Sequence, residues 1–276
     1  MYNKWNDVKG KIDSQSPLIH CITSPIAIND CANAVLALGA KPIMAEHPLE
    51  VENITLMSKS LAVSLANITD ARAESIMISG KAACKAGISS VIDLVGVTCS
   101  KMRADIAKKY ITQCRPAVIK GNVSEIKAVC GMGFDASSGI DVSDKDKVDS
   151  ANPKSIEEMS YIVKNYAAAN GCVVMASGET DIISDGKEVY HISNGSSRMA
   201  DVTGTGCILN CITAVFMSVT DALTACVLAA AVLGISGELA DDSRGLGTYH
   251  IGLIDSLSLM DSEKFSQMAK IKKYNK

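Results

Sequence analysis

Residues 201–210, with the sequence DVTGTGCILN, place two glycines, two threonines and a thiol ahead of an apolar run. Gly204 and Gly206 permit backbone angles that let several N–H groups converge on one point. A helix starting near Cys207 would add the positive end of its dipole. Such a turn suits the charge that develops on a phosphoryl group during transfer, but a plain tight connection before a buried helix would also fit. The stretch matches neither GxxxxGK[ST] nor GxGxxG, which excludes a P-loop.

Two further places combine residue types that could hold a cation. Asn122 and Glu125 lie three residues apart where a strand is expected to pass into a helix, so their side chains share one helical face. Their oxygens could hold Mg²⁺ through water, but the pair also fits a capping box. Asp93 lies at the C-terminal end of another expected strand, and ligands collect at such ends in open α/β sheets. Alternatively, Asp93 caps the loop that follows the strand.

Short apolar runs alternate with helical patterns along most of the chain. The expected strands are 17–22, 41–45, 61–66, 89–95, 116–120 and 172–176. Apolar spacing near 3.6 predicts helices within 24–39, 71–87 and 155–171, each followed or closed by glycine. Alternating elements of this kind predict an α/β fold, a mostly parallel central sheet flanked by helices on both faces.

The segment 180–194, TDIISDGKEVYHISN, departs from this alternation. It predicts two short strands around Asp185-Gly186, a dipeptide that favours a tight type I′ turn, and hence a late antiparallel hairpin. Nearly continuous helix should follow. With no internal repeat or linker, residues 1–276 are expected to form a single domain, and the polar stretch from Gly131 to Pro153 a surface excursion.

Composition narrows the class of protein. A net charge of -3 and a pI near 5.8 argue against a nucleic-acid partner. Ten cysteines without a C-x-x-C pair, and a polar N-terminus, predict buried thiols in the cytoplasm. The apolar run from Ala222 to Gly237 is short and rich in small residues, which favours a buried helix over a membrane span. The basic tail from Lys270 to Lys273 is expected to be a solvated helix end.

Several segments together resemble one family of enzymes. DVTGTGC after the hairpin is similar to the anion-hole loop of ribokinase-like small-molecule kinases, and its cysteine form resembles the hydroxyethylthiazole kinases. Residues 20–46 resemble the substrate-side N-terminal region of that family. VIDLVG (91–96), IKGNVSEI (119–126) and SGETDIISDG (177–186) are similar to its D-P-V-G, R-G-N-x-S-E-I and T-G-E-x-D-x-x-x-D-G segments. The resemblance therefore covers most of the chain.

This resemblance implies a ribokinase-like three-layer sandwich that transfers the γ-phosphoryl group of ATP, with Mg²⁺, to the alcohol of 4-methyl-5-(2-hydroxyethyl)thiazole in thiamine biosynthesis and salvage. It also implies a homotrimer with active sites near subunit interfaces. For the metal it implicates Asp93, Asn122 and Glu125, and for ATP it implicates Lys120 and Ser177. The residues expected to bind the alcohol are Met44, Ser24 and Gly204. Those expected to act in phosphoryl transfer are Gly204, Thr205, Gly206 and Cys207.

Two departures from the family pattern bear on the substrate more than on the reaction, and a third is expected to be structural. The family's I-T-N becomes Ile22-Thr23-Ser24, and its N-I-G-T becomes residues 64–67, Ser-Leu-Ala-Asn. Both changes fall near the expected alcohol pocket, whereas Leu94 in place of proline is expected to be structural. A kinase for another heterocyclic alcohol, such as a hydroxymethylpyrimidine, and a thiazole-binding protein without turnover are therefore the alternatives.

Cys207 stands where most ribokinase-like kinases carry an aspartate that accepts the proton of the attacked hydroxyl. A thiol is a weaker base at neutral pH, although a helix N-terminus should lower its pKa. We expect Cys207 to be a weak base or an orienting group, with the glycine turn supplying most of the catalysis. A packed thiol without a chemical role is the alternative, and His20 is likewise expected to be a packed residue.

Overall fold

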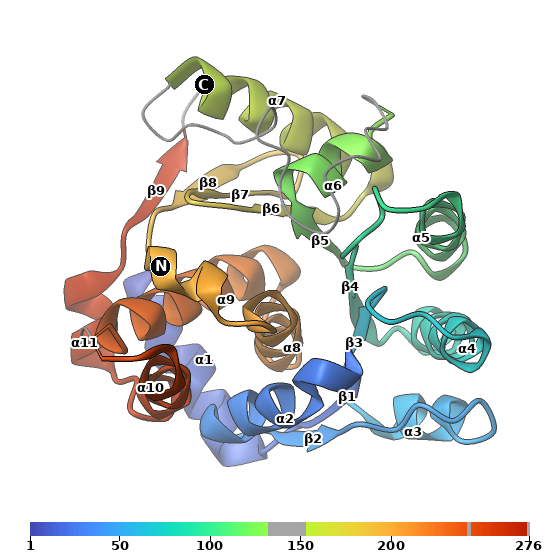
Figure 1. Cartoon of the computed structure of the whole chain (residues 1–276), viewed down its shortest axis with the longest axis horizontal. Coiled ribbons are helices and arrows are strands. Elements are labelled where there is room, and N and C mark those ends of the chain that lie inside the picture. The colour runs from blue at the N-terminus through green and yellow to red at the C-terminus, as the bar shows by residue number, and fades with distance from the viewer. Residues whose placement is uncertain (132–152, 242–243, 275–276) are drawn as a thin grey trace.

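A nine-stranded sheet runs through the protein in the order β2-β1-β3-β4-β5-β6-β7-β8-β9 (Figure 1). The computed structural model describes residues 1–131, 153–241 and 244–274. Its six parallel strands are β1 (Leu18–Ile22), β2 (Lys41–Ile43), β3 (Ser60–Ser64), β4 (Ser89–Asp93), β5 (Val118–Asn122) and β6 (Val173–Ser177). All six lie where the sequence predicts strands, so the mostly parallel sheet is confirmed.

Helices cover both faces of the sheet, as predicted. One face carries α1 (Tyr2–Gln15), α2 (Ile28–Ala37), α8 (Thr205–Met217), α9 (Ala222–Leu239), α10 (Leu246–Ser258) and α11 (Ser262–Met268). The other carries α3 (Val51–Met57), α4 (Asp70–Ala86), α5 (Lys101–Cys114), α6 (Val123–Val129) and α7 (Pro153–Asn170). A separate apolar core lies on each side, which makes the architecture a three-layer sandwich.

Alternation along the strands decides which face receives each polar side chain. On β4, Val91 packs into the core beneath α8 and Ile92 into the opposite core, so Asp93 returns to the α8 side. Val118 and Ile119 alternate in the same way on β5, which puts Lys120 on the α8 side as well. Asp93, the last residue of β4, and Lys120, in the middle of β5, therefore both point toward α8.

The predicted hairpin is present, but its turn is not type I′. β7 (Asp181–Ser184) and β8 (Val189–Ile192) pair antiparallel with Ser184 opposite Val189, which leaves a four-residue loop between them. Within the loop only Gly186 has a positive φ, 87°, whereas a type I′ turn needs two such residues. The carboxylate of Asp185 accepts the N–H groups of Lys187 and Glu188, and these bonds favour the longer loop.

The basic tail was expected to be a helix end, and this expectation is wrong. Residues Ile271–Tyr274 form strand β9, which pairs antiparallel with β8 and closes the edge of the sheet. Its two central residues, Lys272 and Lys273, are exposed, and lysines of this kind are common on the edge strand of a sheet.

The apolar helix α9 is buried inside the protein, as the sequence predicts. Among the described residues it is the one helix long and apolar enough to cross a membrane, with a mean hydropathy of 1.9 over its 18 residues. Of these residues, 78% are buried inside the protein. It packs between α8 and α10 against the sheet. The polar stretch from Gly131 to Pro153 falls almost entirely outside the described residues.

Candidate active site

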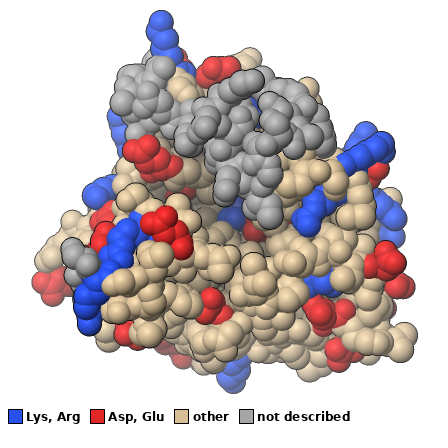
Figure 2. Space-filling view, viewed as in Figure 1, with Lys and Arg blue, Asp and Glu red and all other residues tan. Residues whose placement is uncertain are grey.

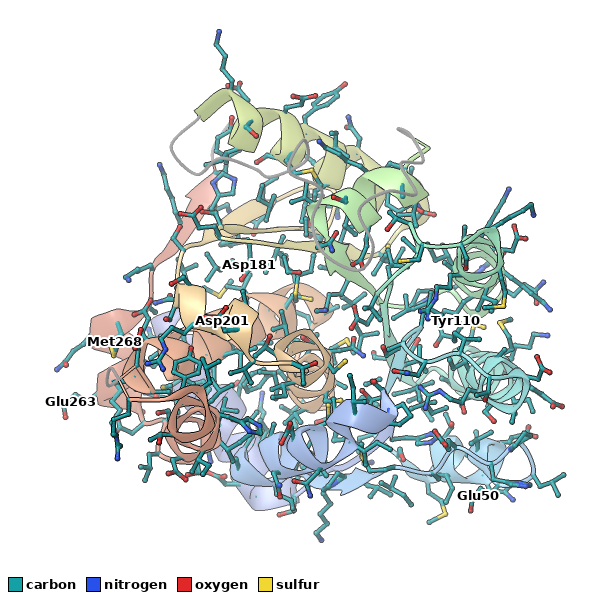
Figure 3. All side chains as sticks on the ribbon, in the orientation of Figure 1. Glu50, Tyr110, Asp181, Asp201, Glu263 and Met268 are labelled. Carbon is teal, nitrogen blue, oxygen red and sulfur yellow. The ribbon has the colours of Figure 1, made fainter. Side chains whose placement is uncertain are left out.

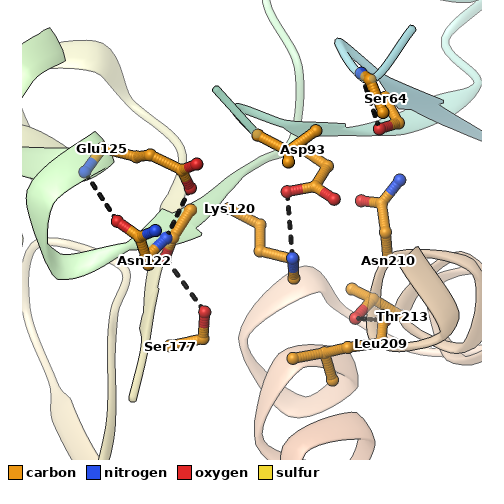
Figure 4. A network of polar contacts seen from close by, with 12 residues as sticks. Ser64, Asp93, Lys120, Asn122, Glu125, Ser177, Leu209, Asn210 and Thr213 are labelled. Carbon is orange, nitrogen blue, oxygen red and sulfur yellow. Dashed lines mark hydrogen bonds and ion pairs between the residues drawn. The ribbon is translucent and has the colours of Figure 1, made fainter. Parts of the chain in front are cut away.

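Asp93 and Lys120 form a buried ion pair at the ends of β4 and β5. The two residues are register partners in the sheet, and Lys120 Nζ lies 3.0 Å from Asp93 Oδ1, with both side chains 3% exposed (Figure 4). Burial alone would lower the pKa of Lys120, but the charge and hydrogen bond of Asp93, with Glu125 nearby, outweigh it and raise that pKa. Lys120 is therefore a fixed positive charge on a central strand, beside the carboxyl end of β4.

Asn122 and Glu125 form a capping box at the start of α6. Asn122 Oδ1 accepts the N–H of Glu125 at 2.9 Å, and Glu125 Oε2 accepts the N–H of Asn122 at 2.8 Å. The other carboxylate oxygen accepts the N–H of Gly96 at 2.8 Å. Burial, followed by repulsion from Asp93, raises the pKa of Glu125 to about 7. The capping box that the sequence offered as an alternative is thus present, and it fixes the Glu125 carboxylate beside Asp93.

The glycine-rich turn has the geometry of an anion-binding site. Gly204 is the N-cap of α8 with φ 91°, a left-handed angle that favours glycine. The first helical hydrogen bond runs from the N–H of Ile208 to Gly204 O. Within the described residues, the N–H groups of Thr205, Gly206 and Cys207 have no backbone or side-chain acceptor, so they are free to bind an anion.

The same turn lies against Lys120. A Cβ atom built on Gly206 would be 3.7 Å from Lys120 Nζ, which is ordinary contact. The first turn of α8 and the buried lysine therefore converge on one place, where positive charge and free N–H groups can act on the same oxygen atoms.

Cys207 lies in the first turn of α8 and is 9% exposed. The sequence suggested that the helix N-terminus would lower its pKa, and this is wrong. Burial, with repulsion from Asp93 and Cys31, raises the pKa of Cys207 to about 12, because these effects outweigh the attraction of Lys120. At neutral pH the thiol is protonated, so it cannot supply a thiolate base.

The residues expected on the alcohol side lie across the turn from β5. Met44 follows β2, is partly buried and packs against the core beneath α8. Ser24 follows β1, is 1% exposed and precedes the short 3-10 turn Pro25–Ala27. A Cβ atom on Gly204 would meet Ala27 Cβ at 3.1 Å. The segment after β1 therefore touches the anion-binding turn.

His20 is a packed residue, as predicted. It is fully buried, with Nδ1 2.9 Å from Thr55 Oγ1 and Nε2 2.9 Å from Ala45 O. Burial lowers its pKa. Its ring anchors the backbone directly after Met44 and takes no part in proton transfer.

A cavity of about 1340 Å³ opens from the anion-binding turn toward β8. Ser177 lines it at the end of β6, beside Asn122, and its Oγ lies 3.3 Å from Gly121 O. Thr205 and Gly206 line the same cavity, which is large enough for a nucleotide. Figure 2 shows basic and acidic side chains intermingled on this face, which is hollowed near its centre.

Asp181 is a buried acid in the cavity wall. It lies within the segment SGETDIISDG, but it was not predicted as a site residue from the sequence. It starts β7 and lies on the side facing α9 (Figure 3), since the next residue but one, Ile183, packs in the same core. Asp181 Oδ1 accepts the N–H of Gly178 at 3.0 Å. Burial raises its pKa to about 7, against the smaller effects of that bond and of Lys120.

Replacing this acid gives a pH-dependent prediction. Because the folded pKa of Asp181, about 7, lies above the unfolded value of 3.8, the wild-type protein loses stability as pH rises through this window. The variant Asp181→Asn cannot ionise and still accepts the N–H of Gly178. At pH 8 its free energy of unfolding should exceed that of wild type by about 1–3 kcal/mol, with a smaller difference at pH 5. Urea unfolding at both pH values measures this, and a pH-independent difference would contradict it.

The residues near Lys120 suit a hydrated cation. Asp93, Glu125 and Asp181 are three buried acidic side chains close to this one lysine, so groups that can carry negative charge outnumber the positive one. Asn210 on α8, which the sequence did not single out, donates to Val63 O at 3.0 Å, and its buried Oδ1 has no partner in the described part of the chain. Figure 4 shows this amide beside Asp93. Acceptors in excess fit a cation or its water shell.

Direct ligation is less favoured by the same geometry. Both oxygens of Glu125 and Oδ1 of Asn122 already accept backbone N–H groups. No group of three or more His, Cys, Asp or Glu side chains is arranged around one point in the described ranges. An ion here would therefore be held largely through water.

Comparison with known proteins identifies close relatives. The hydroxyethylthiazole kinase family matches residues 10–263. Hydroxyethylthiazole kinase 2 of Clostridium botulinum is 47% identical over 267 residues, which cover 97% of this chain and 99% of that protein. The solved structure of the hydroxyethylthiazole kinase protein of Pyrococcus horikoshii OT3 has a TM-score of 0.86 at 26% identity, over 98% of both chains.

The fold is also shared more widely. A ribokinase-like superfamily protein of Enterococcus faecalis V583 has a TM-score of 0.59 at 12% identity, over 90% of this chain and 88% of that one. At this identity the likeness concerns the fold alone. It confirms the ribokinase-like fold that the sequence predicts.

Proposed function

The chain belongs to the hydroxyethylthiazole kinase family, and from this membership we propose that it transfers the γ-phosphoryl group of ATP to the alcohol of 4-methyl-5-(2-hydroxyethyl)thiazole. The membership confirms the resemblance seen in the sequence and the prediction that the protein is a kinase. The observation that carries the proposal is the meeting of three free N–H groups, at residues 205–207, with the buried charge of Lys120, at the turn where Thr205 and Gly206 line a nucleotide-sized cavity.

In the proposed mechanism, ATP lies in this cavity with its terminal phosphate at the N-terminus of α8. The N–H groups of Thr205, Gly206 and Cys207 bind the equatorial oxygens of the transferring group, and Gly204 shapes the turn that aims them. Lys120 neutralises phosphate charge from the β5 side, and Ser177 contributes a hydroxyl to the nucleotide. Positioning and charge neutralisation then carry most of the rate enhancement.

Magnesium is the proposed metal cofactor. Glu125, Asn122 and Asp93 would hold it through water, consistent with the excess of buried acceptors around Lys120. When bound, the ion would neutralise charge on the phosphate oxygens. The contribution of the chain itself is to keep Glu125 fixed by its two backbone hydrogen bonds.

The alcohol is proposed to lie between Met44, Ser24 and Gly204, on the far side of the turn from the nucleotide. The segment that carries Ser24 reaches the turn, because Ala27, three residues later, lies against Gly204. An alcohol in this place can point its hydroxyl at the phosphate held by α8. The thiazole phosphate so formed would serve thiamine biosynthesis and salvage, in the cytoplasm.

A panel of alcohols tests the substrate. Coupled ADP-release assays with the hydroxyethylthiazole, a hydroxymethylpyrimidine and a simple alkyl alcohol should give the highest kcat/KM for the thiazole. A preference for the pyrimidine would instead support the alternative kinase. Binding of the thiazole without ADP release from any alcohol would support a binding protein that has lost turnover.

The raised pKa of Cys207 makes a second prediction about pH. Because burial raises the pKa of the thiol to about 12 and keeps it protonated near neutral pH, we propose that it orients the hydroxyl and does not act as a base. Cys207→Ala should lower kcat by no more than about tenfold, with an unchanged pH profile between pH 7 and 9.5. Cys207→Asp should keep or raise turnover. A rate limb with a pKa near 8.5 in wild type that disappears in Cys207→Ala would contradict the orienting role.

We also propose that residues 1–276 form one kinase domain and that three copies assemble around the β2 edge. β2 is the last strand on its side of the sheet. Large apolar side chains are exposed in the segments that precede and follow it in the sequence, namely Ile26 at 66%, Leu36 at 55%, Leu49 at 88% and Met57 at 67%. Patches of this kind mark contact surfaces. Light scattering after gel filtration should give three times the mass of 29.0 kDa, and a monomer across micromolar concentrations would contradict the assembly.

A further inference from the structure

The large cavity reaches beyond the anion-binding turn to the opposite face of the sheet. The first turn of α8 lines it on one side, whereas Val123 and Ile156 line it on the side of α7. His191 on β8 also lies on the α7 side, because its register partner on β7, Ile182, packs in that core. A nucleotide with its phosphates at α8 would therefore place its planar base among these side chains.

The hydrogen bonds of Ser160 fix the tautomer of His191. Ser160 Oγ donates to Ile156 O at 2.7 Å and also lies 2.8 Å from His191 Nε2. Because the hydroxyl has a single hydrogen, which Ile156 O accepts, the imidazole must be the donor in the second contact. His191 therefore carries its proton on Nε2, and Nδ1 keeps a lone pair.

The imidazole of His191 is held neutral and in place. Burial, with the positive charge of Lys272 across the β8–β9 pairing, lowers the pKa of His191. One face of the ring packs against Tyr274, with 5.0 Å between the ring centroids. The ring is therefore oriented before a ligand binds.

The remaining ring nitrogen, Nδ1, can accept a hydrogen bond from a ligand. In the part of the chain that the structure describes, it has no hydrogen-bond partner, and it is not one of the fully buried polar atoms that lack a partner there. Nδ1 of His191 is therefore open to the cavity that the residue lines.

We propose that His191 is a specificity-determining residue whose Nδ1 accepts a hydrogen bond from the exocyclic amine of the nucleotide base, and that Ser160 is the positioning residue that fixes its tautomer. This inference deepens the proposed function and rests on it, since it needs a nucleotide in this cavity. The ligand class that it fits is an aminopurine nucleotide. A purine with a keto oxygen in place of the amine is disfavoured, because two acceptors would then face one another.

Two nucleotides that differ in one group test this assignment. ATP has an exocyclic amine on its purine ring, and purine riboside triphosphate has a hydrogen in its place. The wild-type KM should be lower for ATP by about 3- to 10-fold, the contribution of one hydrogen bond. His191→Gln should lose this preference with kcat within about twofold, since the glutamine amide reaches the place of Nε2 and not that of Nδ1. A wild-type protein without the preference, or a His191→Gln protein that keeps it, would overturn the assignment.

His191→Asn is the rescue variant. The amide oxygen of asparagine is as many bonds from Cβ as Nδ1 is, so this variant should recover the preference for ATP while losing the contact with Ser160. A merely structural role would order the two variants the other way, because glutamine keeps the contact with Ser160. His47→Gln, at an exposed histidine after β2, is the matched control and should change neither KM. A preference that is kept in His191→Gln and lost in His191→Asn would overturn the contact.

NMR of the ¹⁵N-labelled imidazole tests the role of Ser160. The wild-type ring should show a protonated Nε2 and an unprotonated Nδ1, and ATP should shift the Nδ1 resonance more than purine riboside triphosphate does. Ser160→Ala should give a mixture of the two tautomers and raise KM for ATP by about twofold or more, with kcat unchanged. A wild-type ring protonated on Nδ1 would overturn the assignment.

Calorimetric binding of the two nucleotides separates this inference from the proposed function. Tighter binding of ATP than of purine riboside triphosphate, in a protein that forms no thiazole phosphate, would support the contact while the proposed function fails. Equal binding of both nucleotides in a protein that does form the product would overturn the contact alone. Absence of binding by either nucleotide would overturn both.

Discussion

Lys120→Met should unfold more easily than wild type and turn over far more slowly. The substitution leaves Asp93 as a buried carboxylate without its partner at 3.0 Å, which typically costs about 3–5 kcal/mol. It also removes the positive charge next to Gly206, and loss of one such stabilising group typically lowers kcat by about 10²- to 10³-fold. Urea unfolding and the coupled ADP-release assay measure the two effects.

A double variant separates stability from catalysis at this position. Lys120→Met combined with Asp93→Asn removes both charges, so it should regain most of the lost stability while turnover stays low. Lys120→Arg, which keeps the charge that the family places here, should retain the fold and most of the turnover. A Lys120→Met protein with wild-type stability and kcat would contradict the assigned role of the ion pair.

Gly204→Ala should mainly affect turnover. At φ 91° an alanine is strained, at a cost of about 1–2 kcal/mol, and its Cβ would press on Ala27 Cβ at 3.1 Å. The turn must then shift, and a misplacement of this kind can cost about 10²-fold in rate. We therefore expect kcat to fall by about 10²-fold, with a modest fall in melting temperature.

The matched control is Gly247→Ala in α10. No atom lies within 4 Å of a Cβ built there, and its φ is not in the left-handed region. This variant should keep kcat and be neutral or slightly more stable, because alanine is the better helix former. If Gly204→Ala behaved like the control, the turn could not be the place where the phosphoryl group is held.

Local sequence patterns were sufficient to predict the six parallel strands and the helices α2, α4 and α7. Each parallel strand is a short apolar run, and alternation then dictates that Asp93 and Lys120 share the α8 face. The predictions for the basic tail and for the hairpin turn were wrong, and each error has a physical reason. β9 is stabilised by pairing with β8, a contact far away in sequence, and Asp185 caps a longer loop with its own carboxylate.

The sequence was enough to predict which residue types form the site, but it did not show which side chains are buried or how burial changes their pKa values. The family resemblance supplied Asp93, Lys120, Asn122 and Glu125, and the structure brings them together. The pKa of Cys207 was misjudged because the effect of burial is larger than that of the helix end. Asp181 and Asn210 were missed, since neither spacing nor composition shows which side chains of a strand or helix face a cavity.

Product analysis tests the central claim most directly. Purified protein incubated with ATP, Mg²⁺ and 4-methyl-5-(2-hydroxyethyl)thiazole can be followed by ³¹P NMR. The proposed function predicts one phosphomonoester of the thiazole alcohol for each ADP formed, and neither product in Lys120→Met over the same time. Formation of ADP with inorganic phosphate alone, or no thiazole phosphate from a folded wild-type protein, would contradict it.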